Sequence, residues 1–257
     1  GDKMNLKQLK EKLQNSNYEE FVKIKEGLIN DDRKSVINLL DKYERYYNNL
    51  INEKLEYESR LKYEKKLYNM GIKYIAGVDE VGRGPLAGSV YAAAVILNPD
   101  IYILGVKDSK KLSPKKREIL SDEIKAKALS YSIGFATVDE IDNLNILNAT
   151  KLAMERAING LNIKPEYILI DALKLKKICI PQISIIKGDD LSASIGAASI
   201  IAKVTRDEYM RNIASLYPEY MFDKNKGYGT KDHINAIKKF GLCPIHRKTF
   251  VKNFVKE

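Results

Sequence analysis

The chain has 257 residues, enough to bury one large core, or one core and a small second unit. Its 44 lysines and arginines outnumber 34 acidic residues, giving a net charge of +10 and a pI near 9.3. A membrane-spanning protein is excluded, because the longest uncharged apolar run, residues 86–97, is too short to cross a bilayer.

The basic surplus suits a polyanionic partner such as nucleic acid, or an anionic membrane surface; a solvated lysine-rich surface is the alternative. Residues 203–257 carry 12 basic and 6 acidic residues, so they hold most of the surplus. The start of the chain lacks an apolar signal segment. Cys179 and Cys243 lie in no metal-ligand spacing, which predicts reduced thiols in a cytoplasmic protein.

Residues 1–70 predict a helical N-terminal extension. Within it a 3.5-residue spacing joins ten positions: Val36, Leu40, Tyr43, Tyr47, Leu50, Lys54, Tyr57, Leu61, Glu64 and Tyr68. Because eight of the ten are apolar or aromatic, we expect this face of a long helix to pack against other residues. A surface for stacking nucleic-acid bases is the alternative.

Residues 71–257 predict an α/β unit. Five strands are expected, in "IKYIAGVD", "GSVYAAAVIL", "YSIGFATV", "EYILID" and "QISIIKG". Four helices are expected: one capped by Ser113, one long helix over 139–161, one from about 191 to 217, and one capped by Thr230 or Asp232. A tight early turn predicts an antiparallel meander, and later helix–strand alternation predicts parallel pairing. The expected fold is therefore a mixed five-stranded sheet with helices on both faces.

Carboxylates end three of the predicted strands. Asp79 and Glu80 end the first, Asp171 ends the fourth, and Asp189 and Asp190 end the fifth. One acid at a strand end is commonly a turn former or a helix cap, but ligand sites of α/β sheets also form at strand ends. Three strands that end this way predict that the acids converge.

Converging carboxylates repel one another unless a cation neutralises them. Oxygen ligands without nearby cysteine or histidine select Mg²⁺ or Mn²⁺, and two such ions suit hydrolysis of a phosphodiester. Asp79 and Glu80 face opposite sides of a regular strand, so both reach one site only if the chain bends, which Gly82 allows, or if one acts through its carbonyl. His233 is expected at a helix start, and His246 in the basic patch.

Eight stretches carry a family resemblance: "GVDEVGRGPLAG", "DSKKLS", "NILNAT", "YILIDA", "IIKGDD", "SIGAASIIAKVTRD", "NKGYGT" and "HRKTF". In this order and spacing they resemble bacterial ribonuclease HII, the type 2 ribonuclease H family, over residues 71–251. The resemblance implies an RNase H-like fold for residues 71–257, with a C-terminal helical substrate-binding segment. It also implies cleavage of RNA in RNA–DNA hybrids, and 5′ to single ribonucleotides in duplex DNA, leaving a 3′-hydroxyl and a 5′-phosphate.

The resemblance also implies site residues. Asp79, Glu80 and Asp171 would bind Mn²⁺ or Mg²⁺, and Asp189 would complete the catalytic set. Whether Asp189 or its neighbour Asp190 faces the site stays open. The matched substrate-binding positions are Gly82, Arg83, Gly84, Lys110, Lys111, Lys203, Arg206 and Tyr228. The glycine-flanked turn would approach the ribose, Tyr228 would stack on the sugar, and Lys110, Lys111, Lys203 and Arg206 would contact phosphates. A monomer acting in ribonucleotide excision repair is expected.

Two other functions stay open at this point. One is the activity of the sister type, ribonuclease HIII, which carries lysine at the position of Arg83 and a different N-terminal domain. The other is a hybrid-binding protein of the same fold without catalysis, against which the complete acidic set argues.

Overall fold

The structure, a computed structural model, describes residues 4–253. The chain forms two compact units, residues 1–56 and 57–257, and the boundary between them along the chain falls within the long helix α3 (Lys34–Arg60). This boundary precedes the predicted division at residue 70, because Tyr57 and Leu61 pack into the core of the second unit. In the described part of the chain, no helix combines the length and apolarity that crossing a bilayer requires.

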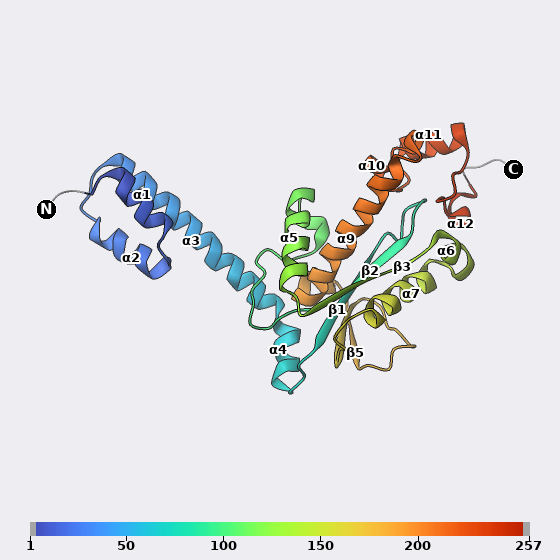
Figure 1. The fold of residues 1–257 in the computed structure, drawn as a ribbon, viewed down its shortest axis with the longest axis horizontal. Helices are drawn as coiled ribbons and strands as arrows, with labels where there is room; N and C mark the ends of the chain where they lie inside the picture. The colour runs from blue at the N-terminus through green and yellow to red at the C-terminus, as the bar shows by residue number, and fades with distance from the viewer. Residues whose placement is uncertain (1–3, 254–257) are drawn as a thin grey trace. The chain divides into compact units, whose positions relative to one another are not determined.

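The first unit is a small helical bundle built from α1 (Leu6–Gln14), α2 (Tyr18–Gly27) and the first part of α3 (Figure 1). Asn5 and Asn17 begin α1 and α2 with capping boxes, each side chain accepting a hydrogen bond from a backbone N–H in the first turn. The core contains apolar residues from all three helices, namely Leu9, Leu13, Phe21, Val36, Leu40 and Tyr47.

The second unit is organised by one mixed sheet with the strand order β3-β2-β1-β4-β5. β1 pairs antiparallel with β2, and β2 with β3, whereas β4 lies parallel to β1 and β5 parallel to β4. The predicted fold class is thus confirmed. The strands are β1 (Ile75–Val81), β2 (Val90–Ile96), β3 (Ser130–Ala136), β4 (Tyr167–Asp171) and β5 (Gln182–Ile185).

Helices cover both faces of the sheet (Figure 1). On one face, Val95 of β2 packs with α9 (Ala193–Ala214) and α5 (Pro114–Lys127). On the other face, its neighbour Ala94 packs with α7 (Ile146–Asn159). All residues of β2 are buried, as expected for a strand covered on both sides.

The structure corrects two predicted boundaries. The single helix predicted over 139–161 is two helices, α6 (Val138–Leu144) and α7, because Asn145 adopts φ 69° and its side chain accepts a hydrogen bond from the Asn148 N–H as the cap of α7. The fifth strand ends at Ile185, so Asp189 and Asp190 lie in a separate short helix, α8 (Gly188–Leu191).

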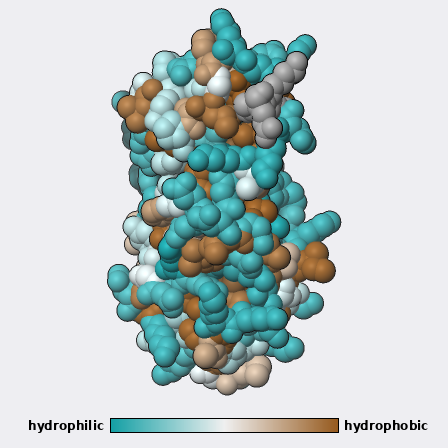
Figure 2. Space-filling model, turned by 90° about the vertical axis from the view of Figure 1, so that its right-hand side faces the viewer, coloured by the Kyte–Doolittle hydropathy of each residue, from teal (hydrophilic) through white to brown (hydrophobic). Residues whose placement is uncertain are grey.

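The remaining elements complete the second unit. They are α4 (Lys62–Asn69), the 3-10 helices η1 (Ser109–Lys111) and η2 (Pro218–Tyr220), α10 (Phe222–Asn225), α11 (Lys231–Phe240) and α12 (Lys248–Val251). Of the two caps predicted for α11, Thr230 is the one observed. Figure 2 shows that the face carrying the C-terminal helices is covered mainly by hydrophilic side chains, with apolar ones in small separate patches.

Glu64 of α4 is fully buried, although its side chain is ionisable. Its Oε1 accepts hydrogen bonds from Ser192 Oγ at 2.6 Å and from the Ser194 N–H at 3.0 Å. Burial raises the pKa of this carboxyl. The acidic member of the predicted stripe therefore packs, because the start of α9 supplies hydrogen-bond donors there, whereas Lys54 of the same stripe is exposed.

Candidate active site

The parallel register of β1 and β4 brings two of the acids together. Val78 lies beside Ile170, so the next residues, Asp79 and Asp171, end the paired segment at the same level. Asp79 is buried, and its Oδ1 accepts from the Glu80 N–H at 2.7 Å. The predicted convergence of the first and fourth strands follows from this register.

Glu80 continues the regular pairing of β1, opposite Ala92 of β2, so the bend expected in the strand does not come before it. Its Oε1 lies 3.5 Å from the guanidinium of Arg83, and its Oε2 is buried without a hydrogen-bond partner. Burial, and then Asp171, raise the pKa of the Glu80 carboxyl against the opposing charge of Arg83, and the contribution of Asp171 indicates that the two carboxylates are close.

Asp171 is held by the turn that leads from β5 into α8. Its Oδ1 accepts a hydrogen bond from the Gly188 N–H at 2.7 Å. A Cβ at Gly188 would lie 2.6 Å from Ile195 Cδ1 and 3.3 Å from that same carboxylate oxygen. Because Lys187 adopts φ 58°, the chain turns sharply there and directs α8 back to the acids.

Asp189, rather than Asp190, faces the other acids. Burial, then Asp108 and Asp171, raise the pKa of the Asp189 carboxyl to about 6, and Lys110, 3.9 Å away, opposes this shift. Asp190 instead forms an ion pair with Lys111. Asp108 lies beside the fourth acid although the sequence did not single it out; its place in "DSKKLS" was the available signal.

The electrostatics of the cluster fit a divalent cation. Burial, then Glu80 and Asp171, raise the pKa of Asp79 well above its ordinary value, so the negative charges destabilise one another. Every donor is a carboxylate oxygen, and the unpartnered Glu80 Oε2 is a buried acceptor that a hard cation would satisfy. Among residues 4–253, no three or more histidine, cysteine, aspartate or glutamate side chains are already grouped closely enough to hold a metal ion.

Next to the acids, two buried arginines hold the turn over residues 82–89. Arg247 donates to the carbonyls of Gly82 at 2.5 Å, Arg83 at 2.9 Å and Gly88 at 2.7 Å. Arg206 donates to the carbonyls of Ala87, Ser89 and Lys226. Gly82 adopts φ +90°, and a Cβ there would lie 2.2 Å from Arg206 Nε, so only glycine fits.

These contacts correct two predictions. Arg206 was expected to contact phosphates, but it is fully buried, and backbone carbonyls occupy its donors. His246 was expected in a basic surface patch, but only 2% of its surface is exposed. Arg247 was not singled out, although it lies in the matched stretch "HRKTF" and is fully buried.

Other predicted substrate-binding residues lie around this turn. Tyr228 is exposed, and its ring approaches Gly84: a Cβ at Gly84 would lie 3.7 Å from Tyr228 Cε1. Lys110 is exposed beside Asp189. Lys203 lies on α9 with only 17% of its side chain exposed, in a 2.8 Å ion pair with Asp207. The site therefore joins a buried acidic cluster to the exposed Arg83 of the turn and to the exposed Tyr228 of a neighbouring loop.

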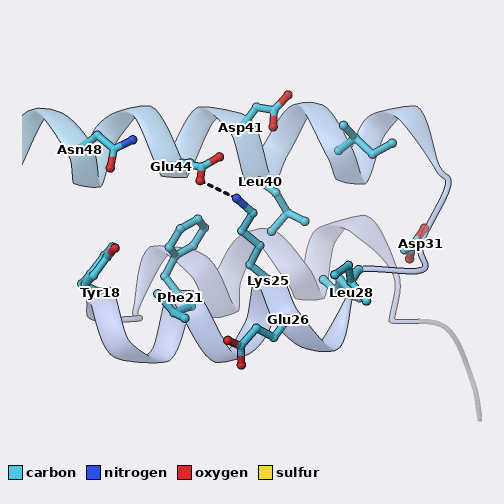
Figure 3. Close-up of a pocket in the computed structure, with 13 residues that line it drawn as sticks. Tyr18, Phe21, Lys25, Glu26, Leu28, Asp31, Leu40, Asp41, Glu44 and Asn48 are labelled. Carbon is cyan, nitrogen blue, oxygen red and sulfur yellow. Dashed lines mark hydrogen bonds and ion pairs between the residues drawn. The ribbon is translucent and has the colours of Figure 1, made fainter.

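A groove in the first unit is unrelated to the acids (Figure 3). It runs between α2 and α3, with Phe21 and Leu40 on its apolar lining and the Lys25–Glu44 ion pair crossing it. None of the predicted site residues lines it.

Comparison with known proteins identifies the family. The sequence model named "Ribonuclease HII" matches residues 76–254, and the one named "Ribonuclease HII N-terminal domain" matches residues 5–68. The chain belongs to the ribonuclease HII family. It is a ribonuclease H, a nuclease, as the sequence motifs predicted.

Similar proteins extend over nearly the whole chain. The ribonuclease HII of Bacillus cytotoxicus is 48% identical over 256 residues, 99% of this chain and 98% of its own. That of Ruminiclostridium cellulolyticum is 50% identical over 253 residues, 98% and 99% of the two chains. The crystal structure of the ribonuclease H2 from Pyrococcus horikoshii OT3 matches with a TM-score of 0.59 at 30% identity, covering 72% of this chain and 100% of that one.

Proposed function

We propose that this ribonuclease HII is a divalent-metal-dependent endonuclease that hydrolyses the RNA strand of RNA–DNA hybrids. It also cuts 5′ to a single ribonucleotide in duplex DNA and leaves a 3′-hydroxyl and a 5′-phosphate. The observation that carries the proposal is the convergence of Asp79, Glu80, Asp171 and Asp189 from β1, β4 and α8 into one buried cluster beside an exposed turn.

In this proposal Asp79, Glu80 and Asp171 hold Mn²⁺ or Mg²⁺, and Asp189 orients the attacking water or helps to hold a second ion. Bound divalent ions supply Lewis-acid activation of the water and neutralise the leaving oxygen. The protein's own contribution is to fix the carboxylates: Gly188 N–H fixes Asp171, and Glu80 N–H fixes Asp79. The short helix α8 positions Asp189, and the positive charge of Lys110 partly offsets the charge of its carboxylate.

Recognition of RNA within DNA is assigned to the turn at Gly82, Arg83 and Gly84 and to the adjacent Tyr228. The 2′-hydroxyl is the group that separates a ribonucleotide from a deoxyribonucleotide, and glycine-flanked backbone can approach it closely. In this proposal the exposed Tyr228 ring, next to Gly84, stacks on the sugar. Arg83, with Lys110 and Lys111, supplies positive charge for phosphates.

The test is to map cleavage on a duplex that contains one ribonucleotide, with and without Mn²⁺ or Mg²⁺. Asp171→Asn keeps an oxygen to accept from Gly188 N–H, so the fold persists, but it removes a charge from the cluster. We expect cleavage to fall by more than about 100-fold while hybrid binding remains.

The matched control is Asp190→Asn, because Asp190 is the neighbouring acid that pairs with Lys111 outside the cluster. It should retain activity within a few fold of the unmodified enzyme. Near-full activity of Asp171→Asn would contradict the assignment of the site. Cleavage of hybrids but not of the single-ribonucleotide duplex would instead favour a ribonuclease HIII-like activity.

A further inference from the structure

The chain's two histidines face each other inside the C-terminal part of the second unit. His233 is fully buried and His246 is 2% exposed, and their Nε2 atoms lie 3.0 Å apart. The rings of Tyr220 and Phe222 enclose them, with ring centroids between 4.8 and 6.3 Å from those of the imidazoles. The ribonuclease reaction proposed above assigns them no role.

The hydrogen-bond partners fix which nitrogen of each ring carries the proton. His233 Nδ1 lies 2.8 Å from the Tyr228 carbonyl, which can only accept, so Nδ1 carries the hydrogen. The Nε2 of a neutral His233 must then accept, and His246 Nε2 must donate to it. His246 Nδ1 consequently accepts from the Cys243 N–H at 2.9 Å.

This arrangement requires both rings to be neutral. A proton added at His233 Nε2 would point at the hydrogen of His246 Nε2. One added at His246 Nδ1 would meet the Cys243 N–H at 2.9 Å, and the Cys243 carbonyl, 3.3 Å from the same nitrogen, already accepts from the His246 backbone N–H. The side chains that enclose the pair from η2 and α10, Tyr220 and Phe222, carry no charge that would stabilise an imidazolium. Burial accordingly lowers the pKa of both histidines.

The hydrogen-bonded chain ends at Tyr228, the exposed tyrosine beside Gly84. The same loop is held from its other side, since Leu86 N–H donates to the Gly227 carbonyl at 2.8 Å. His246 is followed directly by Arg247, whose side chain holds the carbonyls of Gly82 and Arg83. The loop that carries Tyr228 is thus linked through His233 to His246, and the next residue, Arg247, holds the glycine-flanked turn.

We propose that His233 and His246 are positioning residues, which hold the Tyr228 carbonyl so that the Tyr228 ring keeps its place opposite Gly84 and recognises a ribonucleotide joined to DNA. This inference rests on the proposed function and deepens it, because it assigns junction specificity to a buried pair that never contacts the substrate.

The decisive experiment is a double-mutant cycle between His233 and Tyr228, read on a single-ribonucleotide duplex and on a hybrid with a continuous RNA strand. His233→Phe removes the donor to Tyr228 and keeps a ring. We expect it to lower kcat/KM on the single-ribonucleotide duplex about five- to tenfold, mainly through KM, and to affect the continuous hybrid less. In a Tyr228→Ala background, the same change should alter kcat/KM less than about twofold.

His233→Asn is the conservative variant, because its amide can still donate to the Tyr228 carbonyl from about the position of Nδ1. It should recover most of the loss. A His233→Phe effect that is equally large in the Tyr228→Ala background would overturn the proposal, since it would show a general structural role.

A second measurement does not depend on activity or on a variant that folds. Only two imidazoles occur in the chain, so long-range proton–nitrogen NMR spectra of the unmodified protein at pH 7 resolve both tautomers. We expect hydrogen on Nδ1 of one ring and on Nε2 of the other. Two identical tautomers, or a charged ring, would contradict the proposed hydrogen bond between two neutral imidazoles. If the unmodified enzyme fails to cut the single-ribonucleotide duplex while the tautomers are as expected, the proposed function fails and the pair stands.

Discussion

Replacing Gly77 with alanine is expected to separate β1 from α9. A Cβ at Gly77 would lie 2.1 Å from the Ser194 carbonyl carbon, 2.3 Å from the Ile195 nitrogen and 2.4 Å from the Ser194 carbonyl oxygen. All three are backbone atoms in the first turn of α9, so no side chain can rotate away. Restoring a contact of about 3.4 Å requires the strand and the helix to move apart by roughly 1.3 Å.

The expected cost follows from this displacement. Overpacking a tight core costs about 1–3 kcal/mol, and a clash between two backbones falls at the upper end, about 3 kcal/mol. For a unit of this size, that lowers Tm by about 6–12 °C. Asp79 lies two residues further along β1 and on the same face, so a shift of this size should also lower kcat, by up to about 100-fold.

Thermal unfolding by circular dichroism and cleavage kinetics well below Tm measure the two effects. Gly84→Ala is the matched stability control, because its Cβ would meet only Tyr228 Cε1, at an ordinary 3.7 Å. The control should unfold within about 0.5 kcal/mol of the unmodified protein. If Gly77→Ala matched it in stability and kept full kcat, close contact between β1 and α9 would not be what positions Asp79.

Two further predictions concern the buried basic groups. Arg247→Lys replaces the several guanidinium nitrogens that reach three carbonyls with a single ammonium nitrogen, so we expect a loss of about 1–3 kcal/mol in urea unfolding and a raised KM; unchanged values for both would refute that role. Burial lowers the pKa of His246 from 6.5 to about 4, so as the pH falls His246 is protonated in the unfolded chain before it is protonated in the folded one. The stability this gives is present above pH 6.5 and is lost on acidification through pH 4. Between pH 7 and pH 5 the unmodified protein should therefore lose about 2 kcal/mol more than His246→Phe, and equal losses would contradict a buried neutral ring.

Much of the acidic site could be predicted from local sequence. Apolar runs that end in acids place Asp79 and Asp171 at strand ends, and the pairing of neighbouring strands then brings them level. The choice between Asp189 and Asp190 could not be predicted in this way. The fifth strand ends earlier than its apolar pattern suggests, and the direction of each side chain depends on α8 and on the left-handed Lys187 before it.

The buried charges could not be read from sequence for a different reason. An arginine in a basic segment has the same local pattern whether it meets phosphates or internal carbonyls. The partners of Arg247, Gly82 and Gly88, are roughly 160 positions away along the chain. Glu64 is similar: its position on the apolar stripe indicated burial, but its donors, Ser192 and Ser194, are known only once α9 is in place.

By itself, the sequence determined the mixed sheet, the family and the acids that share one edge, because these follow from periodicity, turn residues and motifs a few residues long. The tertiary structure alone decided which charged groups lie at the surface and which support the turn from within. The physical reason is that a buried polar group must find a hydrogen-bond partner, and the chain meets that requirement with backbone atoms that are distant in sequence.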